Sequence, residues 1–507
     1  MDKPIKKVAV VGRDADAWLA ALILRLSFLK AENPIEIVLI ELPSKLHPHE
    51  FYSVLPSHQV LHKVMGLRES VVFKTAGQCS LGQRFFNWSG ESTSFFHGYD
   101  THGVPVNNIE FLHYWVKARK HMQLELPLED FSFVVEAAKQ GKFPSLSDSA
   151  AQVSNATYGY HLNALPYISA IAKEAIGLGV VHKIGELKSL DQIDGNISCL
   201  HLSDGSQVQA DLYIDASGED AILISQLEAA DNFESWGQWL PCDKKITASL
   251  PPLSPMPGFA QIVAFQQGWI GYFPLLNRTA LTAIYSSEYA TAEQIINKVN
   301  KVSKASLKAE SVVQSTIKTG ARKKSWIGNC VAIGESAASI EPLDATQLHI
   351  LHLSMLFLRR LFPNSGDLKL EADLYNEKMQ SHLTNIRDFL VAHYKLNQRH
   401  GEPLWDAQRN MQIPQSLEEK ISLFSSRGMV AMCEDETFLE ENWASILIGH
   451  GIMPETYDPL VEKVSRPDQV KHFQKILQYI AAEVAAMPSM QSHIEINTES
   501  SKSSIFS

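Results

Sequence analysis

Short apolar runs alternate with a helical pattern over the first forty residues. An apolar run at 8–11 ends at Gly12, and hydrophobic positions then recur at helical spacing through 16–29. A second apolar run at 35–40 ends at Glu41. The pattern predicts a strand, a helix and a second strand, with an acidic side chain at the tip of the second strand.

Strand patterns return in the middle of the chain, and the last third is predominantly helical in pattern. Two short runs flank Asp204-Gly205, a pair typical of a β-hairpin turn. Further strands are predicted at 211–215 and 326–334, and nearly everything from 348 to about 486 has helical spacing. We expect a module over 1–350, a helical module over 351–490 and a disordered, Ser-rich tail over 491–507.

Composition places the chain among ordinary globular proteins. It has 507 residues, 45% hydrophobic content and a net charge of 45 − 56 = −11, without the basic surface that drives nucleic-acid binding. No apolar run reaches the ~20 residues that a membrane helix needs. The five cysteines are widely spaced and odd in number, which favours reduced thiols. We expect a cytoplasmic protein that binds neither nucleic acid nor membrane.

The turn after the first strand has the position of a dinucleotide-binding loop. Such loops carry G-x-G-x-x-G, because the backbone must approach a pyrophosphate closely. Here only Gly12 of the three glycines remains, since Asp14 takes the second place and Ala17 the third. Glu41 would accept hydrogen bonds from a ribose. Taken alone, the turn is equally compatible with an ordinary strand-to-helix connection.

Several longer stretches resemble the flavin-dependent tryptophan halogenase family, in the family's own order. The resemblance extends over most of the chain. It is carried by the runs YGYHLNA at 158–164, ADLYIDASG at 210–218, GWIGYFP at 268–274, NCVAIG at 329–334 and EPLDAT at 341–346, and in the helical half by Arg387-Asp388-Phe389, His393-Tyr394, Trp443 and Gly449 to Pro454.

This resemblance implies an α/β fold of the FAD/NAD(P)-binding Rossmann-like, flavin-monooxygenase type with a helical substrate module. It implies FAD as cofactor, an aromatic small molecule as substrate, a flavin reductase as partner and a homodimer as a candidate assembly. It assigns FAD contacts and substrate contacts to two sets of residues. The first set is Gly12, Ala17, Glu41, Asp215, Gly334 and Ala337, and the second is Phe96, His97, Trp269 and Trp443.

The chain departs from the family at the residues that perform the chemistry. The family's lysine falls on Ser80, and Lys74 lies six residues earlier. The second tryptophan of the family's W-x-W-x-I-P is Gly271. Asp344 stands where the family has a glutamate, and it can act either as a carboxylate base or as a helix N-cap. Ser80 and Asp344 are therefore the candidate catalytic positions, and standard halogenation is not expected.

The residues expected around FAD have changed as well. The family's G-x-G-E-A-T-x-P loop falls on 49–56, where only Pro56 is retained. Asp14 and Glu335 add negative charges beside the expected pyrophosphate. Retained binding of FAD and its loss therefore both remain open.

Two hypotheses follow. The first is a flavin-dependent oxidoreductase that acts on an indole-like or other aromatic substrate, and the second is a non-catalytic paralogue that binds a small molecule or a protein partner. The pairs His47/His49 and His349/His352 lack a third ligand at recognisable spacing, so no metal is expected. No G-x-S-x-G motif supports a hydrolase.

Overall fold

The computed structural model describes residues 4–500, apart from 31–33, 144–156, 230 and 365–367. The predicted strand–helix–strand unit is confirmed by β1 (Lys7–Gly12), α1 (Asp14–Phe28) and β2 (Glu36–Glu41). β1 pairs in parallel with β2 on one side and with β12 (Leu212–Ala216) on the other. These strands are nearly continuous apolar runs because both faces of this sheet are covered.

This first sheet has six strands in the order β20-β21-β12-β1-β2-β8, and it fixes the class of the fold. A central parallel sheet with helices packed against it is the doubly wound α/β architecture expected from the sequence. The outer strands are β20 (Trp326–Ile327), β21 (Cys330–Ala332) and β8 (Val181–Ile184).

A second, mainly antiparallel sheet has seven strands in the order β18-β14-β17-β16-β15-β5-β6. A three-stranded sheet in the order β3-β7-β4 accompanies it. The strands of these two sheets are β18 (Val313–Thr316), β14 (Lys244–Leu250), β17 (Thr279–Tyr285), β16 (Gly268–Pro274), β15 (Ala260–Phe265), β5 (Gly82–Phe86), β6 (Ser94–Gly98), β3 (Phe51–Val54), β7 (Gly159–Asn163) and β4 (Gln78–Ser80).

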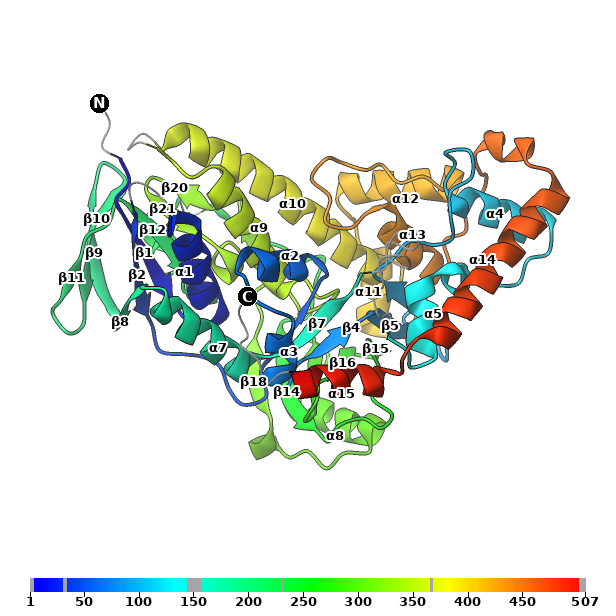
Figure 1. The fold of residues 1–507 in the computed structure, drawn as a ribbon, viewed down its shortest axis with the longest axis horizontal. Helices are drawn as coiled ribbons and strands as arrows, with labels where there is room; N and C mark the ends of the chain where they lie inside the picture. Colours follow the sequence, from blue (N-terminus) through cyan, green and yellow to red (C-terminus); the bar gives the residue numbers. More distant parts are fainter. Residues whose placement is uncertain (1–3, 31–33, 144–156, 230, 365–367, 501–507) are drawn as a thin grey trace.

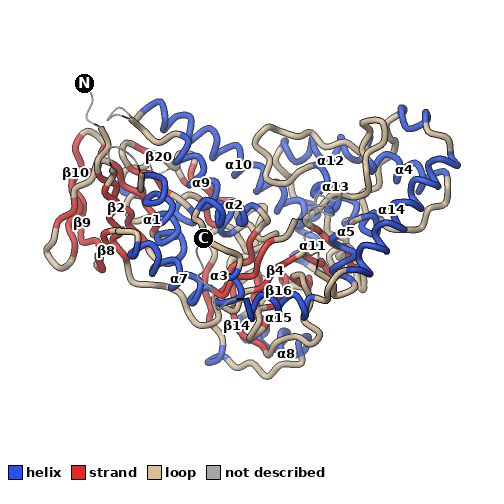
Figure 2. The backbone as a smooth tube through the Cα atoms, in the orientation of Figure 1, coloured by secondary structure: helices blue, strands red, loops and turns tan. Residues whose placement is uncertain are grey.

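The helical part draws on two separate regions of the sequence. Figure 1 shows α4 and α5 from the first half of the chain in the same lobe as α12, α13 and α14, and Figure 2 shows that this lobe is almost entirely helical. The boundary expected at residue 350, between the first module and the helical module, falls inside α9. The helices are α4 (Phe111–His121), α5 (Phe133–Lys139), α9 (Gln347–Arg360), α10 (Lys369–Lys395), α11 (Pro403–Asn410), α12 (Gln415–Arg427), α13 (Glu440–Gly449) and α14 (Arg466–Ala486).

The predicted hairpin is present. Of the tail expected over 491–507, the described part is helical, and 501–507 lie outside the described residues. β10 (Asn196–Leu202) and β11 (Gln207–Val208) pair across a turn in which Gly205 has φ +86°. Residues 490–500 form α15 (Met490–Ser500), which packs on α3 (Ser70–Lys74) and buries Met490. The polar composition of the tail concealed its few apolar contacts. None of the described helices is long and apolar enough to cross a membrane.

Candidate functional site

A cleft of about 370 Å³ opens at the carboxyl edge of the six-stranded sheet, where ligands of such folds bind. It lies among the β1–α1 turn, the loop after β2, the turn after β12 and the η5 turn (Gly334–Ser336). Negative groups outnumber the lysines and arginines of its lining. The acidic lining residues are Asp14, Asp16, Glu50, Glu219 and Glu335, and the basic ones are Arg13, Lys45 and Lys245.

Asp16 occupies the space above Gly334. Its Oδ2 accepts a hydrogen bond of 3.0 Å from the backbone N–H of Glu335. A Cβ atom at position 334 would lie only 2.2 Å from the same oxygen, and Gly334 has φ +54°, which favours glycine. The Asp16 side chain is 9% exposed. A carboxyl group of the chain itself therefore uses the backbone donor that a bound anion would need.

Asp14 begins α1 with φ +58°, a conformation that glycine adopts more readily. Its Oδ1 accepts a hydrogen bond of 2.5 Å from Ser44, and its Oδ2 accepts one of 3.2 Å from the backbone N–H of Lys45. The aspartate thus joins the β1–α1 turn to the loop after β2.

A second bridge crosses the edge of the cleft. Asp220 pairs with Arg13 at 2.6 Å and with Lys45 at 2.7 Å. Two cations that could have faced a phosphate are therefore both paired with one carboxylate of the chain.

The electrostatic state of the cleft reflects burial and crowding of like charges. Burial raises the pKa of Asp16, and the nearby charge of Glu335 raises it further. Burial likewise raises the pKa of Glu335, with Glu219 as an additional cause. Burial also raises the pKa of Asp14. The raised pKa values show that these carboxyl groups are buried close to one another at the edge of the cleft.

Glu41, the predicted ribose ligand, has both carboxylate oxygens engaged by side chains. Oε1 accepts a hydrogen bond of 3.0 Å from the indole N–H of Trp18, and Oε2 lies 2.7 Å from His182 Nε2.

The other residues predicted to contact FAD lie in packed positions. Gly12 allows β1 to approach β12, since a Cβ atom there would lie 2.1 Å from the Ala216 carbonyl oxygen. Ala17 and Ala337 are fully buried.

Asp215 lies at the end of β12 and anchors the turn that follows it. Its Oδ1 accepts hydrogen bonds from the backbone and the hydroxyl of Ser217, at 3.1 and 2.6 Å. Its Oδ2 accepts two from the backbone of Leu223 and Ile224, at 2.8 and 2.9 Å. The Ser336 hydroxyl donates a fifth, at 3.3 Å to Oδ1. With five donors and no exposure, Asp215 anchors the loop beside the cleft.

A second buried polar cluster lies where β6 meets the helical part. Asp344 Oδ1 lies 2.9 Å from His97 Nδ1, and its Oδ2 makes an ion-pair contact of 2.9 Å with His393 Nε2. His393 Nδ1 in turn lies 3.1 Å from His450 Nε2. The structure therefore brings two predicted residues, His97 and Asp344, into direct contact and adds two histidines to them.

The backbone and the charge of Asp344 are both constrained. Asp344 has φ +52° and the next residue, Ala345, has φ +60°, a strained arrangement for two non-glycine residues. Burial alone would raise the pKa of Asp344, but the attraction of His393 and His97 outweighs it and holds that pKa well below its usual range. Asp344 is therefore a buried carboxylate anion held between two imidazoles, and not the N-cap of α9, because that helix begins at Gln347.

Ser80, at the position of the family's lysine, is the last residue of β4 and is buried. Its hydroxyl donates a hydrogen bond of 3.2 Å to the carbonyl oxygen of Gly82. Among the described residues, no hydrogen bond or ion pair joins Ser80 to His97 or Asp344. Lys74 ends α3 with an exposed side chain. Among the described residues, the contacts of Asp344 are with imidazoles and none is with a lysine amine.

The predicted aromatic contacts do not form one wall. Phe96 packs on Phe259, on the face of β6 opposite to His97, because neighbouring strand residues point to opposite faces. The Trp269 indole N–H donates a hydrogen bond of 3.1 Å to Glu341. Trp443 packs edge-on against Phe389, whose ring also lies 5.5 Å from that of His97. Trp443 is thus linked through Phe389 to His97, whereas Trp269 is linked through Glu341, a charged neighbour of Asp344.

Sequence reasoning did not include the polar neighbours of His97. Gln83 is the direct cross-strand partner of His97, and Tyr99 lies two residues further along the chain, so all three side chains share one face of the β5–β6 pair. The two-residue period of these strands is the signal that could have identified Gln83 and Tyr99. His393 and His450 come from distant helices, and no local pattern joins them to His97.

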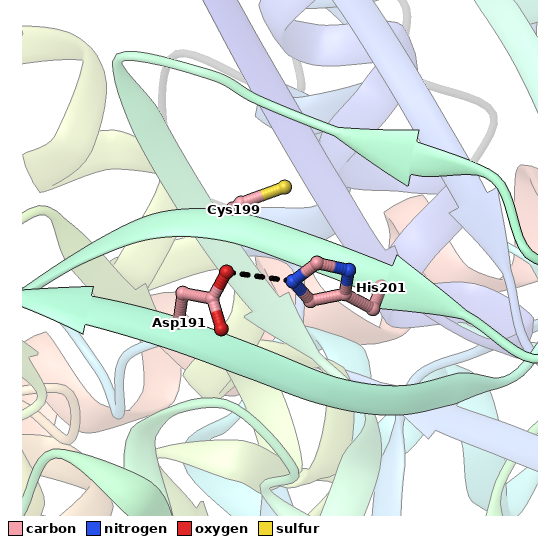
Figure 3. A group of neighbouring side chains, drawn as sticks. All are labelled: Asp191, Cys199 and His201. Atoms are coloured by element: carbon pink, nitrogen blue, oxygen red, sulfur yellow. Dashed lines mark hydrogen bonds and ion pairs between the residues drawn. The ribbon is translucent and has the colours of Figure 1, made fainter.

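The histidine pairs weighed as metal ligands bond to other residues instead. His47 contacts Glu50 at 2.8 Å, and His349 contacts Ser57 and Thr437 at 3.1 and 3.0 Å. One group with closely spaced ligand atoms lies elsewhere, on the hairpin of β9 (Leu187–Ile193) and β10: Asp191, Cys199 and His201. Asp191 and His201 are bonded at 2.7 Å, and Figure 3 shows the Cys199 sulfur directed away from them.

Comparison with known proteins identifies the family. The family model described as tryptophan halogenase matches residues 7–466. The chain belongs to the tryptophan halogenase family. Its curated relatives include the tryptophan 7-halogenase KtzQ from Kutzneria sp. (strain 744), which is 24% identical over 97% of this chain and 98% of its own length. The tryptophan 7-halogenase RebH from Lentzea aerocolonigenes is 23% identical over 90% and 92%.

Solved structures agree with this assignment. BrvH, a flavin-dependent halogenase from Brevundimonas sp. BAL3, has a TM-score of 0.90 and 28% identity, covering 97% of this chain and 99% of its own. Xcc4156, a flavin-dependent halogenase from Xanthomonas campestris, has a TM-score of 0.91 and 24% identity, covering 98% and 99%. The α/β architecture with its helical part is therefore that of the halogenases.

The residues of this chain do not fit the pyrophosphate of FAD, the cofactor that the family implies. Asp16 takes the Glu335 amide and packs on Gly334, where the phosphate would need a donor and open space. Asp14 and the Asp220 bridge occupy the rest of the turn. Both oxygens of the expected ribose ligand Glu41 are engaged. The fold of a flavoprotein is thus retained and a cleft remains at its edge, but carboxyl groups of the chain occupy the phosphate-binding turn.

Proposed function

We propose that this chain is a non-halogenating member of its family, which binds an aromatic small molecule beside His97 without flavin turnover. The observation that carries the proposal is the Asp16 carboxylate on Gly334, because it replaces a phosphate by a group of the chain itself. The loss of the lysine at Ser80 independently argues against halogenation, since the serine hydroxyl bonds to Gly82.

The binding site in this proposal is the buried cluster around Asp344. Its residues come from β6, the loop before α9 and two helices, so they are held by packed elements instead of a mobile loop. Phe389 and Trp443 supply aromatic surface next to it. Such a mixture of apolar walls and a few fixed polar atoms is typical of small-molecule sites.

The second candidate is a flavin-dependent oxidation of an aromatic substrate. The Asp344 carboxylate beside His97 favours it, because hydroxylation needs no lysine and a carboxylate is present at this point. A flavin reductase would then be a required partner, whereas the first candidate needs none.

Titration of the purified full-length chain with FAD, followed by flavin fluorescence and the visible spectrum, distinguishes the two candidates. We expect no saturable binding to the wild type and a measurable affinity for the double variant Asp14→Gly/Asp16→Ala, which empties the turn. Glu41→Ala serves as the control for the ribose position. Tight, stoichiometric binding to the wild type would reject our proposal in favour of the flavin enzyme.

Ligand binding is tested separately by isothermal titration calorimetry with indole, tryptophan and phenol. Saturable binding of one of these, lost in His97→Phe but unchanged in the cleft variant Asp14→Gly, would support the proposed site. If none of them binds, the aromatic-ligand proposal fails whatever the outcome with FAD.

A further inference from the structure

The cleft at the carboxyl edge of the six-stranded sheet contains more carboxyl groups than its own cations pair with. Arg13 and Lys45 both bond to Asp220, at 2.6 and 2.7 Å. Lys245 lies 3.5 Å from Glu50. Among the described residues, no ion pair reaches the other four carboxyl groups of the lining, which belong to Asp14, Asp16, Glu219 and Glu335. The lining therefore has carboxyl groups to spare for a positively charged molecule.

A buried hydroxyl lies among these carboxyl groups. Tyr52, on β3, lines the cleft and is only 9% exposed. Its phenol has no hydrogen-bond partner within the described part of the chain. Burial raises the pKa of this phenol well above its usual value, and the charges of Glu50 and Asp14 raise it further. Because buried polar groups normally have a partner, the Tyr52 hydroxyl indicates a bound molecule that supplies one.

Asp16 offers a second atom to the same molecule. Its Oδ2 accepts the hydrogen bond from the backbone N–H of Glu335, whereas its Oδ1 has no partner among the residues that the structure describes. Like Tyr52, Asp16 lines the cleft and is 9% exposed. An ammonium group suits both side chains, because it carries three donors and a positive charge.

The spacing of the carboxyl groups favours an organic cation over a single metal ion. A metal ion draws its ligand atoms to about 2.0–2.6 Å, so the ligand atoms of a metal site lie close together. Among the described residues, the group of three or more side chains with such closely spaced atoms is on the β9–β10 hairpin and not in the cleft. The cleft volume of about 370 Å³ is that of a small-molecule site.

We propose that this cleft binds a small organic diamine, whose ammonium groups donate hydrogen bonds to the Asp16 carboxylate and the Tyr52 hydroxyl. The carboxyl groups of Asp14, Glu219 and Glu335 balance the remaining positive charge. A place that holds an anion in nucleotide-binding folds thereby recognises a cation in this chain. The inference goes beyond the proposed function and shares with it the premise that FAD does not occupy the cleft.

Binding of a diamine should be tighter at higher pH. Burial and the charge of Glu335 raise the pKa of Asp16 to about 8. A cation pairs with the ionised carboxylate, while alkylammonium groups, with a pKa of ~10, stay charged throughout this range. Below pH ~8 the diamine must therefore displace a proton, and its affinity should fall by up to about tenfold per pH unit. The charged and titratable groups that line the cleft with Asp16 are Arg13, Asp14, Lys45, His47, Glu50, Tyr52, Glu219, Lys245 and Glu335.

Isothermal titration calorimetry of the full-length chain with cadaverine tests the inference. We expect saturable binding at pH ~8, weaker binding at pH ~6, and a release of protons that appears as a dependence of the heat on the buffer. Pentylamine lacks one of the two amino groups and should bind about tenfold more weakly or less. Absence of cadaverine binding, equal affinities for the two amines, or tighter binding of Ca²⁺ in competition with cadaverine would each overturn the inference.

Two variants and a matched control locate the binding. Tyr52→Phe removes the hydroxyl, and Asp16→Asn removes the charge but keeps an oxygen that can accept from the Glu335 amide. Each should weaken cadaverine binding by about tenfold or more, because each loses a hydrogen bond in which one partner is charged. Asp16→Asn should also flatten the pH dependence.

The control is Asp191→Asn, which makes the same change of net charge at an exposed site outside the cleft lining. Its affinity for cadaverine should stay within about twofold of the wild type, since salt screens distant exposed charges. Equal losses in Asp191→Asn and Asp16→Asn would mean that the negative net charge alone attracts the amine, and this would overturn the inference. Circular dichroism of all three variants verifies that they are folded.

The FAD titration distinguishes failure of this inference from failure of the proposed function. If neither FAD nor cadaverine binds the wild type, only the diamine site is overturned. Tight FAD binding that cadaverine does not weaken would overturn both. Tight FAD binding that cadaverine weakens would overturn the proposed function and support a cation site in the cleft.

Discussion

Asp16 lies directly against Gly334, with its Oδ2 at the place where a side chain at position 334 would begin. The contact occupies the turn at which nucleotide-binding folds of this type hold a pyrophosphate. It also links the first turn of α1 to the η5 turn, which are more than 300 residues apart in the sequence.

A double-mutant cycle measures this contact. Gly334→Ala should destabilise the chain by about 2–4 kcal/mol, because it adds a clash with Asp16 to the cost of φ +54°. In the Asp16→Ala background the clash disappears and only the backbone cost of about 1–2 kcal/mol should remain. Chemical unfolding of the four proteins gives the coupling energy. Additive effects would mean that Asp16 does not lie on Gly334.

The stability of the chain should also depend on pH through Asp16. Burial raises the native pKa of Asp16 to about 8, whereas its pKa in the unfolded chain is ~4. Between these two pH values the native state therefore binds more protons than the unfolded state. Stability therefore falls as the pH rises through this window. Relative to Asp16→Asn, which stays neutral, the wild type should lose up to about 1.4 kcal/mol per pH unit between pH ~5 and ~7. Urea unfolding at several pH values measures the difference, and parallel curves would contradict it.

Glu41 should contribute to stability instead of nucleotide binding. Glu41→Ala removes the acceptor of Trp18 and the partner of His182, which should cost about 1–2 kcal/mol at this partly exposed site. In the double variant Asp14→Gly/Asp16→Ala, the same change should leave FAD affinity within about twofold, because the carboxylate is already engaged. A loss of FAD affinity of about tenfold or more would indicate that Glu41 binds the ribose, because one hydrogen bond to a charged group changes an affinity by about that factor.

The elements that follow from neighbouring residues were predictable. The strand–helix–strand unit ending at Glu41 and the turn at Asp204-Gly205 depend on local periodicity and on a glycine with positive φ. The resemblance of distant motifs added the family. The expected acidic crowding near Asp14 and Glu335 is also present in the cleft.

The partners of the site residues could not be predicted, because they come from remote parts of the chain. Asp16 reaches Glu335, and Asp344 joins His97 to His393 across three separate elements. The sequence pattern also does not indicate whether the Glu41 carboxylate is available to a ligand or is hydrogen-bonded to Trp18 and His182. Phe96 was grouped with His97, although adjacent strand residues necessarily face opposite sides.

Asp344 should be far more important for stability than an exposed aspartate in an ion pair. Asp344→Asn removes the only charge that faces His97 and His393 in contacts of 2.9 Å, so we expect a loss of about 3–5 kcal/mol at neutral pH. Because its native pKa is depressed, this contribution is present above the unfolded value of ~4 and declines as the pH falls below it. The matched control is Asp220→Asn, whose half-exposed pairs with Arg13 and Lys45 should contribute about 1 kcal/mol or less. Urea unfolding of both variants at pH ~7 and ~3.5 measures the difference, and similar losses for the two aspartates would refute the buried His97–Asp344–His393 arrangement.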